Sequence, residues 1–231
     1  MGARIDEADP LLAGFFTLRD AARLLKMDNT QRIRAWLTGW GKSKSGPVID
    51  PDFDGRVVSF LDLMEARFVE HFRRQKVSMP TIRLAAQELR REWKTKHPLA
   101  YANSDKYLTD RRKIFAQAAE SEGDKRTWDL ATNQYEIWAA LEASVAKNVA
   151  FDPVTELARA WKPAGEEFPH VVVDPRLAFG QPVIGERPTP TAAIYKQWRA
   201  EGGNVARVAK WFRIQASSVT EAVEFELSLA A

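Results

Sequence analysis

The stretch from residue 170 to 189 constrains the fold more than any other part of this sequence. A β-branched run after His170 leads into Asp174-Pro175, Gly-Gln-Pro-Val-Ile-Gly follows at 180–185, and Arg187-Pro-Thr189 opens three patterns of helical spacing. β-Branched runs favour strands, Gly and Pro mark turns, and Pro is favoured in the first turn of a helix. We therefore predict that residues 166–231 form a three-helix, helix-turn-helix-like domain with a small β-hairpin.

The three C-terminal helices have recognisable ends. The first covers about Thr189–Ala200 and stops at Gly202-Gly203, where glycine favours termination. Asn204 is a good N-cap for the second helix, and Ser217-Ser218 begin the third. The third helix has three glutamates and no basic residue over 216–231. Because such a helix repels phosphate, we expect this domain to bind protein or to self-associate rather than to contact DNA.

A second helix-turn-helix pattern lies near the N-terminus. Thr17 and Asp20 have the spacing of a capping box, and Leu18, Ala21, Ala22 and Leu25 follow at helical intervals. A turn at 27–30 then leads to a helix over Thr30–Thr38. Two short helices joined by a tight turn are typical of DNA-binding domains.

The residues after this pattern predict a wing and further helices. Two β-branched runs, 47–50 and 56–60, flank Asp54-Gly55 and predict a hairpin. Helices are expected over 61–76 and from Ser78 to about residue 96, and a second hairpin over Tyr107–Phe115. Residues 117–128 have a linker composition, and a further helix is expected over Tyr135–Ala146. The fold class is therefore mainly α, with small β-hairpins.

Positive charge is concentrated on the N-terminal pattern. Residues 17–44 carry seven bases and two acids, whereas the whole chain has a net charge of only +3. The first residues of the second helix in such a motif reach base edges in the major groove, and flanking bases contact phosphates. We expect the DNA-binding residues to be Thr30, Gln31 and Arg34 at the bases, and Arg32, Lys42, Lys44 and Arg56 at phosphates. A solvated basic helix face is the alternative explanation.

Partner-binding candidates are assigned to the C-terminal domain. Aromatic residues are enriched at protein interfaces, and the chain has eight tryptophans. Arg187 could bind an acidic partner residue or a phosphate, but an internal salt bridge to Asp174 is the favoured interpretation. The other candidates are Trp198, Trp211, Phe225 and Leu227, each of which could instead belong to a three-helix core.

Catalytic chemistry is not indicated. The chain has no cysteine, its three histidines (His71, His97 and His170) lie far apart with no second ligand at metal spacing, and no nucleophile motif occurs. The glycines at 180–185 lack the Lys-Ser/Thr ending of a phosphate loop. We therefore expect no catalytic residues, metal or cofactor. No signal peptide or membrane span is indicated, and a cytoplasmic protein is expected.

Two parts of the chain resemble known families. Helix-turn-helix, wing and two helices over about 15–95 resemble the MerR-like DNA-binding domain, and residues 170–228 resemble a small domain common in bacterial antitoxins. The combination resembles an antitoxin of the VapB type. This resemblance implies that the protein neutralises a PIN-like ribonuclease toxin, binds its own promoter DNA as a repressor and forms a homodimer. The implied units are 15–116 (DNA binding), 117–165 (a helical linker) and 166–231 (toxin-associated).

The sequence departs from that family in one respect. Typical antitoxins of this kind are far shorter and neutralise with a disordered tail, whereas this chain is patterned nearly to its end. Masking would then use a folded surface, and the apolar residues 227–231 could insert into a toxin groove. The leading alternative is a stand-alone MerR-like transcription regulator whose C-terminal half dimerises or senses a ligand. A third class is a protein-binding adaptor that never touches DNA.

Overall fold

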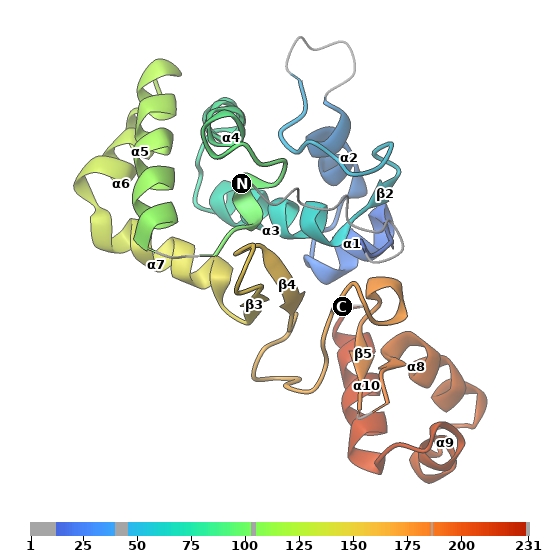
Figure 1. Cartoon of the computed structure of the whole chain (residues 1–231). Coiled ribbons are helices and arrows are strands. Elements are labelled where there is room, and N and C mark those ends of the chain that lie inside the picture. The colour runs from blue at the N-terminus through green and yellow to red at the C-terminus, as the bar shows by residue number, and fades with distance from the viewer. Residues whose placement is uncertain (1–12, 40–45, 103–104, 186, 230–231) are drawn as a thin grey trace.

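The computed structural model confirms a mainly helical fold with small two-stranded sheets (Figure 1). It describes residues 13–39, 46–102, 105–185 and 187–229. Within these ranges the chain forms ten α-helices and three antiparallel strand pairs, β1–β2, β3–β4 and β5–β6. None of the helices in the described part of the chain is both long and apolar enough to cross a bilayer.

The N-terminal group is built on capped helices. Strand β1 (Phe16–Thr17) leads into α1 (Leu18–Leu24), and α2 (Thr30–Thr38) follows after a five-residue turn. The expected capping box is present: Thr17 Oγ1 accepts from the Asp20 backbone N–H at 3.1 Å, and the Asp20 carboxylate accepts from the Thr17 N–H. Strand β2 (Val57–Val58) pairs with β1, and a second capping box on Ser59 starts α3 (Phe60–Arg74).

The middle helices pack on one another, and α7 joins them to α3. Helix α4 (Met79–Trp93) ends before a 3₁₀ turn, η2 (Pro98–Ala100), and α5 (Asp105–Ser121), α6 (Lys125–Asn133) and α7 (Tyr135–Ala146) follow. Trp138 of α7 packs edge-on against Phe72 of α3, and both are fully buried. Asp124 accepts bonds from Ser78 and Thr81 at the start of α4 and from Thr127 at the start of α6. One carboxylate therefore caps two helices.

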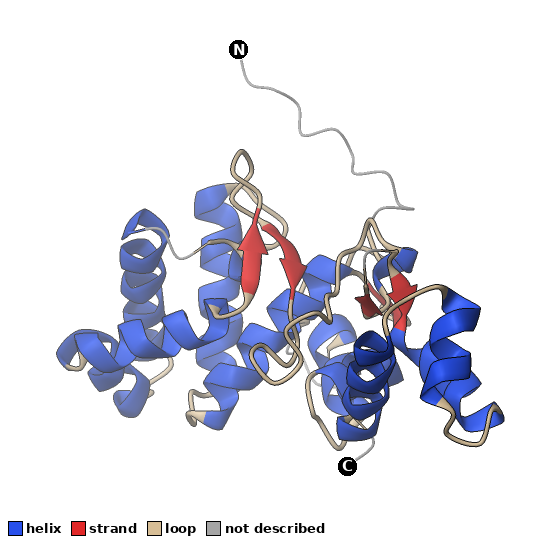
Figure 2. Ribbon diagram, turned by 90° about the horizontal axis from the view of Figure 1, so that it is seen from below, coloured by secondary structure: helices blue, strands red, loops and turns tan. Residues whose placement is uncertain are grey.

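Short strands lead to the C-terminal helices. Strands β3 (Val149–Phe151) and β4 (Ala158–Trp161) form a hairpin, and β5 (Val183–Ile184) pairs with β6 (Thr189–Pro190) after a 3₁₀ turn, η3 (Ala178–Gly180). Helices α8 (Thr191–Ala200), α9 (Val205–Phe212) and α10 (Ala216–Ser228) complete the chain. Figure 2 shows that the strands are small connecting pieces between groups of helices.

The C-terminal group is tied to the first helix of the chain. Glu226 of α10 is buried and accepts from Arg23 Nη2 of α1 at 3.1 Å and from Thr191 Oγ1 at 2.5 Å. The N–H of Phe15 donates to the carbonyl of Phe179 at 2.8 Å. Ala178, Phe179 and Gly180 all have positive φ, and a Cβ on Gly180 would lie 2.9 Å from the Phe16 ring. This turn therefore brings the two regions into close contact.

The expected wing is wrong in its pairing. Residues 47–50 do not form a strand with 56–60; the N–H groups of Val48 and Ile49 both donate to the carbonyl of Trp36 at the end of α2. Prolines at 47 and 51 remove ladder donors on either side of this segment, and helix ends leave carbonyls that need partners. Val57–Val58 pair instead with the strand before α1.

The expected second hairpin over Tyr107–Phe115 is also wrong, because these residues lie inside α5. Their buried side chains repeat at helical spacing: Tyr107, Ile114, Phe115 and Ala118. Residues 117–128 are not a linker in the structure, since they hold the end of α5, a short turn and the start of α6. The domain limit expected at residue 116 consequently falls within a continuous helix.

Candidate nucleic-acid interface

Helix α2 presents a polar face to solvent. Gln31, Arg34 and Thr38 are exposed and lie at helical spacing, while Ile33, Trp36 and Leu37 are buried on the opposite side. Asn29 caps the helix by accepting from the Gln31 N–H at 2.7 Å, and Thr30 in the first turn is half-buried. Arg34 forms no ion pair with any residue in the described part of the chain. The face therefore offers an amide and an uncompensated guanidinium side by side.

Arg32 forms contacts within the fold. Its Nη2 lies 2.6 Å from Glu70 Oε2 of α3, and its guanidinium lies over the Trp36 ring at 5.5 Å. Arg74 Nε binds the other oxygen of the same carboxylate at 2.9 Å. Arg32 therefore joins α2 to α3, and because two arginines share one carboxylate, the three side chains together keep a net positive charge.

The remaining expected DNA contacts fall on loops. Lys42 and Lys44 lie outside the described residues. Arg56 is highly exposed and pairs with exposed Asp54 at 3.7 Å, a contact of little strength in water. Gly55 of the same turn approaches the end of α2, where a Cβ would meet Thr38 Cγ2 at 2.4 Å. The Asp-Gly turn thus places Arg56 near α2 without a hairpin.

The expected partner contacts divide into exposed and buried residues. Trp211 is 68% exposed and Leu227 is 46% exposed, so both are accessible. Trp198 is half-buried and stacks on Tyr195 with 6.0 Å between ring centroids. Phe225 is 1% exposed and contacts Phe168 edge-on at 5.8 Å. Phe225 is therefore a core residue and is unavailable to a partner in this fold.

The favoured salt bridge between Arg187 and Asp174 is not formed. Asp174 accepts instead from the backbone N–H and the Nε of Arg176, each at 2.9 Å. The pKa of Asp174 is lowered, because these bonds and the Arg176 charge outweigh a burial that raises it. Arg176 is only two residues from Asp174, so their pairing costs less chain entropy than a pairing with Arg187 would. Arg187 is left exposed on the turn before β6.

A buried cluster of charged side chains was not foreseen. His97 lies between three carboxylates: its Nε2 is 3.0 Å from Asp52 Oδ1, and its Nδ1 is 3.4 Å from Glu65 Oε2 and 3.8 Å from Asp62 Oδ1. Lys96 also contacts Asp52 at 3.0 Å. Asp62 and Glu65 share a face of α3, but His97 follows 32 residues after Glu65, so spacing gave no signal.

Burial and charge act in opposite directions on this cluster. Burial lowers the pKa of His97, but the facing carboxylates of Asp52 and Glu65 outweigh it and raise that pKa to about 10. Burial raises the pKa of Asp62 to about 6, against the opposing charge of His97. The pKa of Asp52 is held well below its usual range; burial raises it, but hydrogen bonds from His97 and Ser59 lower it by more.

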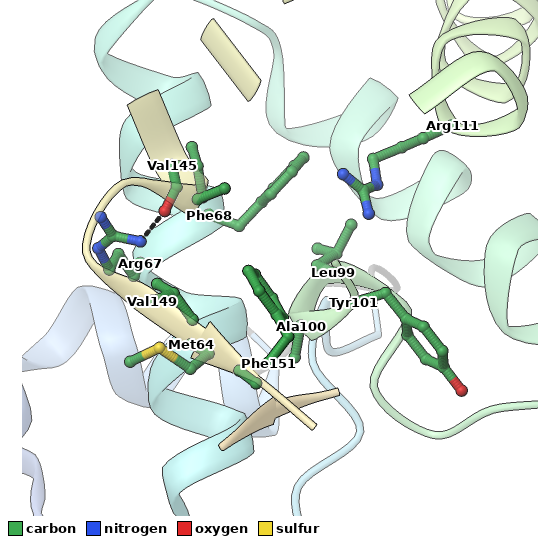
Figure 3. A pocket seen from close by; sticks show the side chains of 12 residues that line it. Met64, Arg67, Phe68, Leu99, Ala100, Tyr101, Arg111, Val145, Val149 and Phe151 are labelled. Atoms are coloured by element: carbon green, nitrogen blue, oxygen red, sulfur yellow. Dashed lines mark hydrogen bonds between the residues drawn. The ribbon is translucent and has the colours of Figure 1, made fainter. Parts of the chain in front are cut away.

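The pocket drawn in Figure 3 is small. It lies between α3, η2, the end of α7 and strands β3–β4, and has a volume of about 20 Å³. Arg67 points at its edge toward the carbonyl of Val145 and lies 5.1 Å from the Trp161 ring; burial lowers its pKa to about 10. Such a volume holds about one water molecule and no larger ligand.

The fold is therefore mainly helical, with two short helices, α1 and α2, joined by a turn near the N-terminus, and with α8, α9 and α10 forming a C-terminal trio. No protein family and no curated protein matches the sequence. Among solved structures, it is similar to the crystal structure of Rv2018 from Mycobacterium tuberculosis, with 22% identity and a TM-score of 0.64. The match covers 90% of this chain and 96% of that one. At this identity the likeness shows a shared fold.

Proposed function

We propose that this protein binds double-stranded DNA through α2 and represses transcription from its own promoter. The observation that carries the proposal is the exposed pair Gln31 and Arg34 on the second helix of a helix-turn-helix. Gln suits adenine and Arg suits guanine in the major groove. Arg56 on the adjoining turn supplies a phosphate contact.

Local geometry supports this role for α2. Its N-terminal end is capped by Asn29, and its inner face is held by buried Ile33, Trp36 and Leu37. The ion pair from Arg32 to Glu70 fixes the helix on α3. A recognition helix needs this rigidity, because a misplaced side chain cannot form two hydrogen bonds to one base. DNA sites for such motifs are usually two-fold, so we propose a homodimer in the cytoplasm.

The C-terminal trio is proposed to bind a PIN-like ribonuclease toxin, which makes the protein an antitoxin. Exposed Trp211 on α9, Leu227 on α10 and Arg187 before β6 supply two apolar side chains and one charge for a protein interface. Exposed aromatic and arginine residues are typical anchors of such interfaces. The antitoxin assignment also predicts a toxin gene beside this one.

A stand-alone regulator is the alternative proposal, with the C-terminal half serving dimerisation. The size of the pocket beside Arg67 weighs against ligand sensing there, since about 20 Å³ is too small for an effector. Co-purification with the neighbouring gene product separates the two proposals. A stable complex that Trp211→Ala weakens supports the antitoxin; a homodimer alone supports the regulator.

The DNA-binding proposal is tested by fluorescence anisotropy on a duplex from the gene's own upstream region and on a shuffled duplex. Arg34→Ala is expected to cost about 1–3 kcal/mol of binding free energy on the first duplex and to relax the preference between them. Arg199→Ala, which removes an exposed arginine of α8, is the matched control and should leave both affinities unchanged. Equal weakening on both duplexes would assign Arg34 to a phosphate contact, and no preference by the unaltered protein would refute sequence-specific binding.

A further inference from the structure

The charged cluster around His97 contains three buried polar atoms without hydrogen bonds. These are Asp62 Oδ1, Glu65 Oε2 and His97 Nδ1, and each belongs to a side chain that is at most 6% exposed. Leaving such atoms unsatisfied inside a protein is costly, and buried examples normally have a partner. His97 Nδ1 and Glu65 Oε2 face each other at 3.4 Å, but Asp62 Oδ1 is 3.8 Å from that ring nitrogen and has no hydrogen-bond partner. This fully buried carboxylate oxygen is therefore available to a ligand that the cluster itself does not supply.

The opposite sides of these side chains are held firmly. Asp62 Oδ2 accepts from the backbone N–H groups of Ser59 and Asp52, at 3.1 and 3.3 Å. Glu65 Oε1 accepts from the Leu99 N–H at 3.1 Å, and Asp52 Oδ2 accepts from the Ser59 hydroxyl at 2.6 Å. Each carboxylate therefore uses one oxygen for support and directs the other to the cluster. Metal ligands are oriented by outer contacts of this kind.

The charges of the cluster do not balance among the side chains alone. Asp52, Asp62 and Glu65 contribute three negative charges when ionised, whereas Lys96 contributes one positive charge. A divalent cation and Lys96 together would balance the three carboxylates. Buried charges require such compensation.

We propose that Asp52, Asp62 and His97 bind a divalent transition-metal cation, with Zn²⁺ as the probe. One ligand atom from each residue lies within 4.8 Å of the others. Zinc bonds imidazole and carboxylate at about 2.0–2.2 Å, so binding would draw these ligand atoms closer together around one cation.

Glu65 is the positioning residue of this site. With the metal on Nε2, the other ring nitrogen of His97 carries a proton and faces Glu65 Oε2 at 3.4 Å. A carboxylate behind a metal-bound histidine fixes its tautomer and increases its basicity. The ligands come from the turn before β2, from α3 and from the residue before η2, so the cation would join three segments of the N-terminal region.

The test uses the full chain, freed of metal by a chelator and titrated with Zn²⁺ and Co²⁺. We expect one equivalent to bind, a rise in Tm, and visible ligand-field absorption with Co²⁺. The ring nitrogens of His97, observed by ¹⁵N NMR, should change from a doubly protonated imidazolium to a metal-bound imidazole. This readout requires no variant, so a variant that fails to fold does not prevent the test.

Variants then locate the site. Asp62→Asn and His97→Gln are expected to weaken binding by more than about 100-fold, and Glu65→Gln by about 10–100-fold. Asp52→Asn, at the rim where the side chain is 25% exposed, provides a ligand variant with less risk to folding. Glu70→Gln is the control, because it alters a buried carboxylate of the same helix outside the cluster. The proposal is overturned if His97 keeps its imidazolium spectrum at millimolar Zn²⁺, or if the ligand variants bind as well as Glu70→Gln.

Discussion

Helix α2 in the N-terminal region and helix α10 in the C-terminal trio use their charged side chains in opposite ways. On α2, Arg32 is paired inside the fold, but Gln31 and Arg34 remain directed to solvent. On α10, two of three glutamates are used inside the fold: Glu221 accepts from the N–H and Nδ1 of His170, both at 2.8 Å, and Glu226 binds Arg23. Only Glu224 of the three is exposed. Helix α2 therefore leaves a charged side chain available to a partner, whereas α10 uses most of its charged side chains in contacts within the fold.

This difference shows that charge composition alone does not identify a recognition helix. The three glutamates of α10 predict an acidic surface, yet the fold leaves little of one. The seven bases of residues 17–44 predict a basic surface, yet Arg23 and Arg32 are held by glutamates from distant elements. The exposed side chains that remain, and their spacing on one helix face, are the better guide to function.

The largest expected change in stability distinguishes a core residue from a surface residue of the C-terminal trio. Phe225→Ala removes a buried ring and should lower the free energy of unfolding by about 3–5 kcal/mol, measured by chemical denaturation. Trp211→Ala, on the exposed face of α9, should change it by no more than about 0.5 kcal/mol. A small loss from Phe225→Ala together with a loss of partner binding would restore Phe225 as an interface residue.

A medium effect is expected where the two regions meet. Glu226→Gln removes the charge that Arg23 contacts and weakens the bond from Thr191, and should lower stability by about 1–3 kcal/mol. A double-mutant cycle with Arg23→Ala should give a coupling energy of at least about 0.5 kcal/mol. Additive losses would mean that Arg23 and Glu226 do not couple α1 to α10. Arg23→Ala should also affect DNA binding less than Arg34→Ala does, because its charge is already compensated.

A smaller effect depends on pH and is confined to the middle helices, where Asp124 caps α4 and α6. Burial raises the pKa of Asp124, but hydrogen bonds from Thr127, Thr81 and Ser78 outweigh it and lower that pKa to about 2. Because the pKa is lower in the folded state, this stabilisation is complete above about pH 4 and is lost as pH falls toward 2.

Asp124→Asn should therefore cost about 1 kcal/mol at neutral pH, as the loss of a helix cap does, and nothing at the lowest pH. Denaturation of both proteins between pH 2 and 7 measures this difference. A difference that is constant with pH would assign the loss to shape rather than to charge. Hydrogen exchange in α10 should be unaffected if the two regions open separately.

Short-range sequence patterns correctly predicted the helices whose ends carry clear capping residues. The capping box of Thr17 and Asp20, the cap at Asn204, and the limits of α7 all follow from short-range patterns and are present in the structure. The two hairpin errors have a different origin. Residues 107–115 have strand-like aromatic and β-branched content, but burial of Tyr107, Ile114 and Phe115 on one face determines a helix.

The candidate site was only partly accessible to sequence reasoning. Exposure of Gln31 and Arg34 follows from helical periodicity once α2 is placed. The pairing of Arg32 with Glu70 and the gathering of Asp52, Asp62 and Glu65 around His97 depend on tertiary packing. No spacing rule connects residues on a turn, a helix and a later 3₁₀ junction. Such clusters become visible only when the chain is folded.

The bond between Arg23 and Glu226 also sets an order of events during synthesis. Its two residues are separated by 203 positions. At translation rates of about 5–20 residues per second, α1 waits roughly 10–40 s for its partner to be made. During this interval the nascent N-terminal helices must remain soluble without α10, and a ribosome that stalls before Glu226 leaves Arg23 without its carboxylate. Helix α10 therefore completes the environment of α1 long after α1 has been made.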